Sequence, residues 1–137
     1  MKIHIPNNCG NSPRSLVAIE LAVNMAAREY SKIEQFLTED FSWVAAGSDK
    51  ALSRLELNTS MDKATQSNIT TERLDIITSI SHGKYAAVSS CTHMSNGVTL
   101  NSHDLYEFTS AGSSAKLLKV TSYAVDSTHS HASNLKS

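Results

Sequence analysis

The sequence predicts an α+β fold in which helices come first and an antiparallel β-meander follows. Between residues 13 and 64, apolar residues recur mostly at helical spacing, with one short strand pattern among them. From residue 69 to 125, four segments with strand patterns are separated by turns, most of them marked by glycine. A meander of this length needs one face covered, and only the N-terminal helices are available to cover it. The expected architecture is therefore a sheet packed on N-terminal helices.

The first helix is predicted from Pro13 to Arg28, after an extended leader of residues 1–11. Ser12 is suited to cap the helix N-terminus, and proline is favoured at the first helical position. The helix carries an apolar stripe at helical spacing. That stripe consists of Leu16, Ile19, Ala22, Val23, Ala26 and Ala27.

A second short helix, a strand and a third helix are predicted next. The second helix has Ile33, Phe36 and Leu37 on its inner face and ends at residues 38–40. Residues 41–46 are expected to form a strand closed by Gly47. The third helix is predicted from a cap at residues 48–49 to about Ala64. Its expected inner residues are Leu52, Leu55 and Met61.

The meander is predicted over four segments: residues 69–81, 85–95, 98–108 and 116–125. Asn96-Gly97 joins the second and third, and this dipeptide is the strongest short hairpin signal because both residues accept positive φ. Residues 127–137 lack apolar content and are expected to be a disordered tail. Without repeats or a linker, residues 1–137 are interpreted as one domain.

Composition excludes several classes of protein. The 137 residues carry a formal net charge of -1, with Lys and Arg spread along the chain, so a nucleic-acid partner is not expected. No apolar run is long enough to predict a membrane span, and no secretory signal is recognised. Cys9 and Cys91 have no metal or redox spacing, which favours a reducing cytoplasm. The six histidines show no metal-ligand spacing either, so no metal site is expected.

Four segments resemble one superfamily. Residues 36–41 (FLTEDF) are similar to its second-helix exit into the first strand, and residues 81–87 to its central hairpin. Residues 104–108 (DLYEF) resemble its penultimate strand, and Lys116, Leu117 and Tyr123 its last strand. With the order of elements, these segments resemble the nuclear transport factor 2-like superfamily, which includes SnoaL-type polyketide cyclases and ketosteroid isomerases.

This resemblance implies a cystatin-like cone: a curved antiparallel sheet around a pocket for a small apolar molecule. Asp104 matches the family's strand carboxylate, which serves as an oxyanion stabiliser in the isomerases and as a general acid/base in the cyclases. The isomerase base and helix tyrosine are missing, because Ala45 and Leu21 stand near those points. The resemblance also implies that Val120 and Ser122, in a set running from Leu118 to Ala124, face the pocket. It implies a homodimer through the outer sheet face.

The pocket face is predicted from the hairpin register. If Asn96-Gly97 is a two-residue turn, Ser89 lies opposite Asp104 and Cys91 lies opposite Ser102. Alternation of side chains then gathers the candidate pocket residues on one face. These are His93, Cys91, Ser102, Asp104 and Tyr106. A bulge or a longer turn would reverse the face of one strand.

Asp104 and His93 are the candidate catalytic residues. Desolvation raises the pKa of a carboxyl group, which suits proton transfer near neutral pH. The alternative for Asp104 is a carboxylate that satisfies a local donor or lies in solvent. The alternative for His93 is a half-solvated ring at the cavity rim. Trp43 and Met61 are candidates for the pocket wall or, alternatively, ordinary core residues.

Two functions are therefore open. One is a cofactor-independent proton-transfer enzyme acting on an apolar carbonyl ligand, of the isomerase, cyclase or dehydratase type. The other is a non-catalytic ligand-binding or dimeric interaction module. No cofactor is implied by either.

Overall fold

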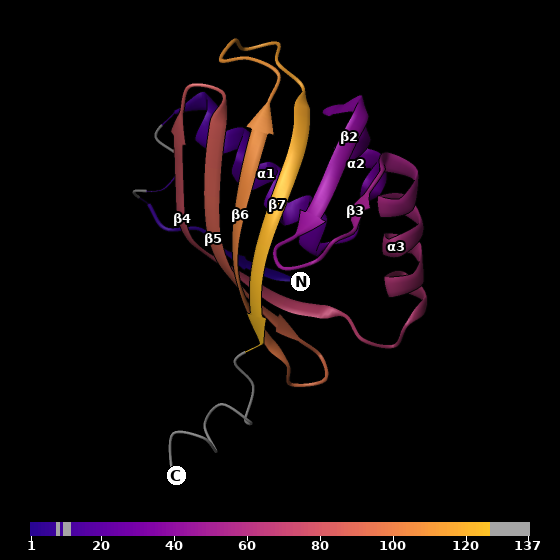
Figure 1. The fold of residues 1–137 in the computed structure, drawn as a ribbon. Helices are drawn as coiled ribbons and strands as arrows, with labels where there is room; N and C mark the ends of the chain where they lie inside the picture. Colours follow the sequence, from indigo (N-terminus) through magenta and orange to yellow (C-terminus); the bar gives the residue numbers. More distant parts are fainter. Residues whose placement is uncertain (8, 10–11, 127–137) are drawn as a thin grey trace.

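The structure is a computed structural model that describes residues 1–7, 9 and 12–126 (Figure 1). Within these residues the helices are α1 (Pro13–Ala26), α2 (Tyr30–Glu34) and α3 (Arg54–Gln66). The strands are β1 (Lys2–His4), β2 (Leu37–Ala45), β3 (Ala51–Leu52), β4 (Thr71–His82), β5 (Tyr85–Met94), β6 (Thr99–Phe108) and β7 (Leu117–Asp126). The predicted tail at residues 127–137 lies outside the described residues.

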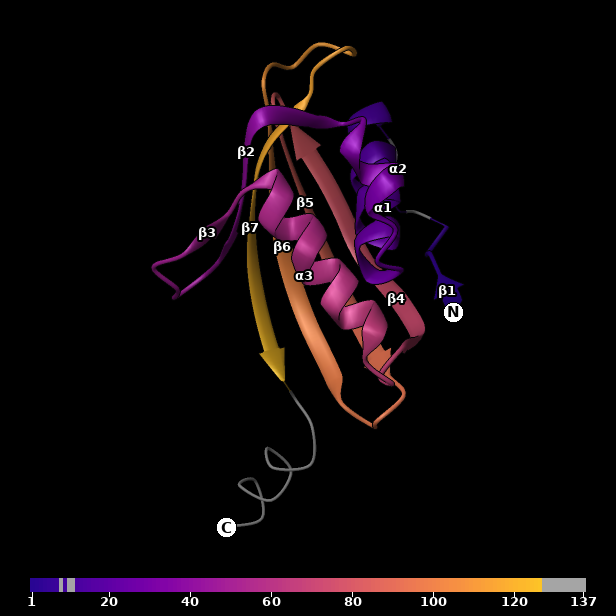
Figure 2. The ribbon, with the colours of Figure 1, turned by 90° about the vertical axis from the view of Figure 1, so that its right-hand side faces the viewer.

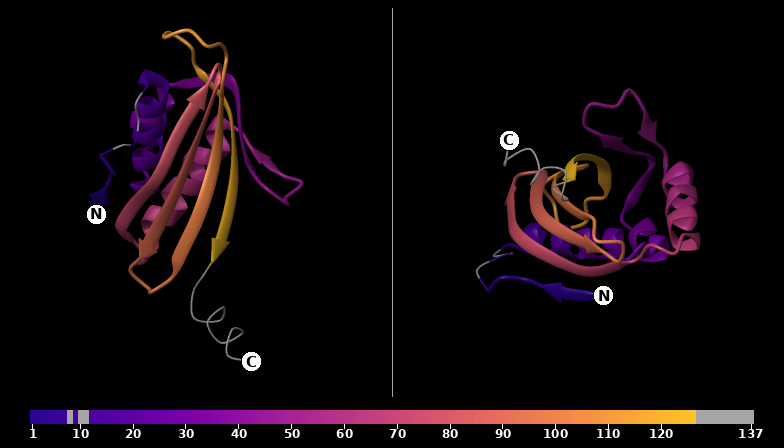
Figure 3. Two further views of the ribbon diagram at one scale, coloured as in Figure 1. Left: turned by 90° about the vertical axis from the view of Figure 1, so that its left-hand side faces the viewer. Right: turned by 90° about the horizontal axis from the view of Figure 1, so that it is seen from below.

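The strands form one curved sheet in the order β1-β4-β5-β6-β7-β2-β3. The long strands β4 to β7 pair antiparallel, as predicted, whereas β1 joins β4 and β2 joins β7 in parallel. The helices lie on the concave side, with α1 packed on β4 and β5 and α3 against β2 (Figure 2). The outer face of the sheet and its curvature are visible in Figure 3. This is the α+β fold that the sequence predicts and the cone that the resemblance implies, with a mixed rather than purely antiparallel sheet.

The N-terminal segment contributes a strand that was not predicted. Residues 1–11 were expected to be an extended leader, but Lys2–His4 pairs with Arg73–Asp75 of β4. The pairing adds an edge to the sheet beyond the meander.

The third helix begins later than predicted. Gly47, at a φ of 87°, lies in the turn that leads β2 into β3, and β3 pairs with β2. The N-cap is Ser53, whose hydroxyl accepts from Glu56 N at 3.2 Å while Glu56 Oε1 accepts from Ser53 N at 3.1 Å. This capping box is a stronger start signal than the Ser48-Asp49 pair that was predicted to cap the helix.

Two predicted inner leucines face solvent instead. Leu16 of α1 and Leu55 of α3 are both exposed. The helices are rotated so that other residues are buried. The buried residues are Ser15, Ala18, Ile19, Leu21, Ala22 and Asn24 in α1, with Leu57 and Met61 in α3.

Hydroxyl groups attach the start of α1 to β4. Ser12 caps the helix, as predicted, by accepting from Ser15 N at 3.2 Å. Its Oγ also lies 2.7 Å from Ser81 Oγ, and Ser79 donates to the Ser15 carbonyl at 3.0 Å. Ser79 and Ser81 reach α1 because Ile77 is an extra residue in β4, a β-bulge that turns the following residues over. The bulge thereby sets the position of α1 over the concave face.

The β5–β6 hairpin has a three-residue loop, so the predicted register is wrong. Met94 N donates to the Val98 carbonyl at 2.9 Å, which leaves residues 95–97 as the loop with Gly97 at a φ of 87°. Asp104 therefore lies opposite Val88 instead of Ser89. A shift of one residue sends every side chain of β5 to the other face.

Candidate functional site

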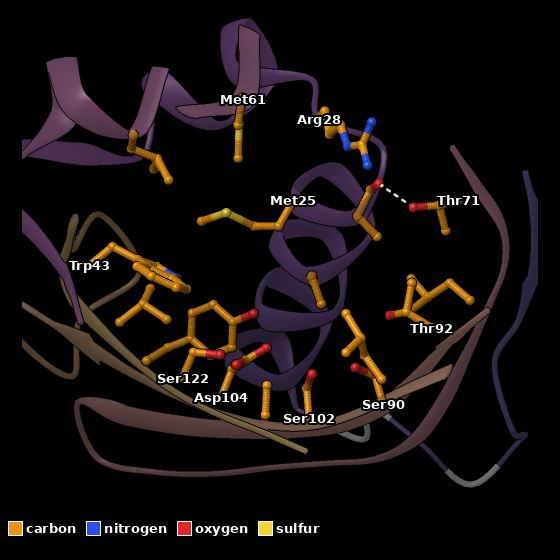
Figure 4. A pocket seen from close by; sticks show the side chains of 18 of the residues that line it. Met25, Arg28, Trp43, Met61, Thr71, Ser90, Thr92, Ser102, Asp104 and Ser122 are labelled. Carbon is orange, nitrogen blue, oxygen red and sulfur yellow. Dashed lines mark hydrogen bonds between the residues drawn. The ribbon is translucent and has the colours of Figure 1, made fainter. Parts of the chain in front are cut away.

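A cavity of about 370 Å³ lies between the concave face of the sheet and the helices α1 and α3 (Figure 4). This volume is within the range of small-molecule sites, which is roughly 300–1,000 Å³. The helices contribute apolar side chains to it. These are Ala22, Met25, Ala26, Leu57 and Met61.

The strands contribute most of the polar groups of the cavity. Six hydroxyl-bearing side chains of the described residues, on four neighbouring strands, line the cavity. They are Thr71, Ser90, Thr92, Ser102, Tyr106 and Ser122. The cavity thus has an apolar side and a side that offers hydrogen bonds, which suits a ligand with both kinds of surface.

Asp104 is the one acidic residue among the described lining residues. It lies on β6 between Val88 of β5 and Ser122 of β7. Its Oδ1 is buried and has no hydrogen-bond partner among the described residues. An unpartnered buried acceptor lowers the stability of the folded state by roughly 1–3 kcal/mol. The stability of the fold therefore does not explain why an aspartate occupies this position.

Burial raises the pKa of the Asp104 carboxyl above its ordinary value. A hydrogen bond with the Ser122 hydroxyl and the charge of His103 act in the opposite direction. Tyr106, which is buried, has a pKa raised well above its ordinary value by burial and by the Asp104 charge. The cavity therefore pairs a carboxyl group that is easier to protonate than usual, and is able to exchange a proton, with a phenol that stays protonated and is able to donate a hydrogen bond.

The structure brings most of the predicted site residues together around the cavity. Seven of the nine line it: Trp43, Met61, Ser102, Asp104, Tyr106, Val120 and Ser122. On β7 the predicted inward set holds for Val120, Ser122 and Ala124 but not for Leu118. Leu118 is an extra residue opposite the Glu107–Phe108 step, and Leu117 is buried instead.

His93 and Cys91 do not line the cavity, so their predicted placement beside Asp104 is wrong. The three-residue loop turns both residues to the outer face of the sheet. There, His93 Nε2 lies 3.1 Å from Asp75 Oδ2 and 3.6 Å from Cys91 Sγ. Arg73 Nε donates to Asp75 Oδ1 at 2.7 Å, and this bond is the main reason for the lowered pKa of Asp75.

The outer cluster does not activate the Cys91 thiol. Burial and the negative charge of Asp75 raise the pKa of Cys91, whereas a nucleophilic cysteine needs a lowered one. No group of three or more His, Cys, Asp or Glu in the described part of the chain is placed to hold a metal ion. None of the helices within the described residues is long and apolar enough to cross a membrane.

The lining residues that sequence reasoning missed include a set on β5 and one arginine. Ser90, Thr92 and Met94 of β5 replace the predicted odd-numbered set. Asn96-Gly97 also fits a three-residue loop with glycine in the left-handed position, and this was the available signal. Arg28 was missed as well: it follows the end of α1 with a φ of 58°, a conformation that the sequence did not indicate.

No protein family profile and no curated protein sequence matches this chain. Solved structures do match. An NTF-2-like protein of unknown function from Burkholderia xenovorans has a TM-score of 0.63 and 15% identity, with 82% of this chain and 81% of that chain covered.

Two further solved structures are similar to this chain to about the same degree. SalBIII, an epoxide hydrolase/cyclase-like enzyme of pyran ring formation in salinomycin, has a TM-score of 0.62 and 16% identity, covering 82% of this chain and 90% of its own. A predicted SnoaL-like polyketide cyclase from Shewanella denitrificans has a TM-score of 0.67 and 8% identity, covering 83% of this chain and 92% of its own. At these identities the likeness concerns the fold.

Proposed function

We propose that this protein, whose fold is that of the nuclear transport factor 2-like and SnoaL-like proteins, binds a small apolar carbonyl compound and transfers a proton on it at Asp104. The observation that carries the proposal is the buried, unpartnered Oδ1 of Asp104 in a cavity with an apolar side. A ligand oxygen or carbon-bound hydrogen would supply the missing contact. No cofactor takes part in the proposed reaction.

Asp104 would act as both base and acid. As a carboxylate it removes a proton from the carbon next to the carbonyl, and the electron pair moves to the carbonyl oxygen to form an enolate. The same carboxyl group then returns the proton to a ligand carbon, so atoms and charge balance. Because Tyr106 keeps its hydroxyl proton, it is a suitable donor to the enolate oxygen. Ser122 and Ser102 are further donors on the same side of the cavity.

Mass spectrometry tests this proposal in two steps. The purified protein is measured under non-denaturing conditions for a retained small molecule, which is then extracted and identified. The molecule is incubated with the protein in deuterium oxide, where reversible proton transfer at carbon incorporates deuterium. We expect an apolar carbonyl compound that gains deuterium only in the presence of the protein.

A non-catalytic binding module is the alternative, and one observation favours it. The described lining residues include no second carboxylate that could act together with Asp104. Leu21, which stands near the position of the isomerase tyrosine, belongs to the buried core. A retained apolar ligand that takes up no deuterium would support this alternative. A cavity that admits no apolar molecule would contradict both functions and leave a structural role.

We further propose that a second copy of the chain covers the outer face of the sheet. A row of neighbours across three strands, Ile80, Ala87 and Leu105, lies on this face, with Ile80 62% and Leu105 39% exposed. Exposed apolar groups that cluster in this way mark interaction surfaces. Tyr123 of β7 is exposed beside the row.

Leu105→Glu is expected to convert such a dimer to a monomer, because two carboxylates would be buried at a symmetric contact. Sedimentation velocity at several protein concentrations measures the change. The matched control is Leu55→Glu, since Leu55 is exposed on α3, away from this face. A wild-type protein that sediments as a monomer at all concentrations would contradict the proposed dimer.

A further inference from the structure

Arg28 has an unusual backbone conformation at the edge of the cavity. It follows the C-cap residue Ala27 with a φ of 58°, where an L-residue other than glycine is disfavoured by roughly 1–2 kcal/mol. Arg28 N donates to the Met25 carbonyl at 3.1 Å, and Glu29 N donates to the Asn24 carbonyl at 3.0 Å. Helices commonly end with this pair of bonds, and glycine usually occupies the position of Arg28. The backbone conformation therefore does not explain the arginine at this position, and its side chain must.

The guanidinium group is held in place by one of its three nitrogens. Nη1 donates to the carbonyl of Ala64 at 2.7 Å and to the carbonyl of Ile69 at 2.9 Å. These two bonds use both hydrogens of Nη1, whereas the group has five in all. Within the described part of the chain, neither Nε nor Nη2 has a hydrogen-bond partner, and Arg28 forms no ion pair.

The two unused nitrogens form one edge of the planar group. Their N–H bonds are parallel, and this geometry matches the two oxygens of a carboxylate. Since Nη1 already fixes the plane, a ligand carboxylate would bind to an edge that is ordered in advance, which lowers the entropy cost of binding.

Arg28 is also the one basic residue among the described lining residues, as Asp104 is the one acid. Figure 4 shows them on opposite sides of the cavity, with Met25 between them. The space between a fixed cation and the carboxyl group is thus bordered by the apolar side chain of Met25 on one side and by hydroxyl groups of the sheet on the other. A single arginine suits a singly charged anion better than a phosphate dianion, for which a second cation would be needed.

We infer that Arg28 binds a ligand carboxylate through Nε and Nη2, and that the ligands of this cavity are apolar organic acids. The carboxylate pairs with Arg28, the apolar body lies along Met25, and the opposite end reaches Asp104. This inference rests on the proposed function, because it assigns the ligand class of the same cavity.

Binding of decanoate and decanol tests the inference, because the two molecules share a chain length and differ in charge. Trp43 is the single tryptophan of the sequence and lines the cavity, so its fluorescence reports binding of both. We expect wild-type protein to bind decanoate at least about ten times more tightly than decanol. This factor corresponds to about 1.4 kcal/mol, the lower end of the range for hydrogen bonds to charged groups.

Arg28→Gln is expected to remove the preference for decanoate while the affinity for decanol stays within about twofold. Arg28→Lys keeps the charge but not the paired N–H edge, so it should retain part of the preference. The control is Lys63→Gln, which removes one positive charge from the last turn of α3, where the side chain is exposed. It should leave the preference unchanged.

Each contrary result has a distinct meaning. Equal affinity of the wild type for decanoate and decanol would overturn the role of Arg28 but leave the apolar cavity in place. Equal weakening of both molecules by Arg28→Gln would show that Arg28 only braces α3, and would overturn the inference as well. Failure of both molecules to bind the wild type would contradict the proposed ligand cavity itself.

Discussion

Asp104→Asn is expected to lower the rate of proton abstraction in the cavity by about 100-fold or more, the usual contribution of a general base. The reason is chemical: the amide has nearly the same shape as the carboxylate but does not accept a proton near neutral pH. The probe is 5-nitrobenzisoxazole, a small apolar molecule whose ring opens when a base removes one carbon-bound proton. Its phenolate product is coloured, so the rate is measured by absorbance.

The pH profile adds a second expectation for the wild type. Only the ionised carboxylate is a base, so the rate should rise as the pH passes through the pKa of Asp104. Because burial raises that pKa, the rise should occur at a higher pH than an exposed aspartate would give. Asp104→Asn should lack this rise altogether.

Glu107→Gln is the matched control for the Asp104 substitution. Glu107 lies on the same strand but belongs to the outer face, where its Oε2 is 3.5 Å from Lys84 Nζ. Its replacement should change the rate less than about twofold. If Asp104→Asn keeps a rate within a few-fold of the wild type, Asp104 is removed from the mechanism.

Ile76→Ala is expected to lower the free energy of unfolding by about 2–5 kcal/mol, the usual cost of truncating a buried isoleucine. Ile76 is 0% exposed and belongs to the main core cluster beneath the helices. The adjacent Ile77 is 57% exposed, so Ile77→Ala should cost less than about 0.5 kcal/mol. Urea unfolding followed by circular dichroism measures both at one protein concentration.

The contrast between these neighbours comes from the alternation of side chains along β4, and Ile80 is the residue that tests the β-bulge beyond them. Ile77 is the extra residue, since Ile76 pairs with Ser90 while Thr78 pairs with Ser89. Ile80→Ala should cost much less than Ile76→Ala, because Ile80 is 62% exposed after the bulge, and similar losses for these two variants would show that the bulge is absent in solution. A regular strand would instead continue the alternation through residues 78 and 80 and place Ile80 inside.

The chain order of the three helices and of strands β2 and β4 to β7 was predictable because each of these elements carries a local signal, whereas β1 and β3 were not predicted. Ser12 and Pro13 mark the start of α1, and strand patterns separated by turns mark the meander. The fold class needed nothing further, since these elements have one way to cover the sheet. Asp104 was also found from the sequence, through its place in the DLYEF segment.

The composition of the site was less predictable, because the length of one loop controls which face of β5 lines the cavity. Because of the loop at residues 95–97, Ser90, Thr92 and Met94 line the cavity in place of the predicted Cys91 and His93. The sequence is compatible with either loop length, since Asn-Gly fits both. In the structure, Ser95 N donates to the Thr70 carbonyl at 2.8 Å, a contact between segments 25 residues apart.

The sequence alone was enough to predict the fold class, the order of the helices and long strands, and Asp104 as the acid of the cavity. Contacts between distant segments fix which face of β5 meets that acid, where the bulges at Ile77 and Leu118 fall, and that Arg28 borders the same space. The physical reason is the two-residue period of a strand: one extra residue costs little locally but reverses every side chain after it. Packing against α1 and the neighbouring strands, not the local sequence, selects between the two faces.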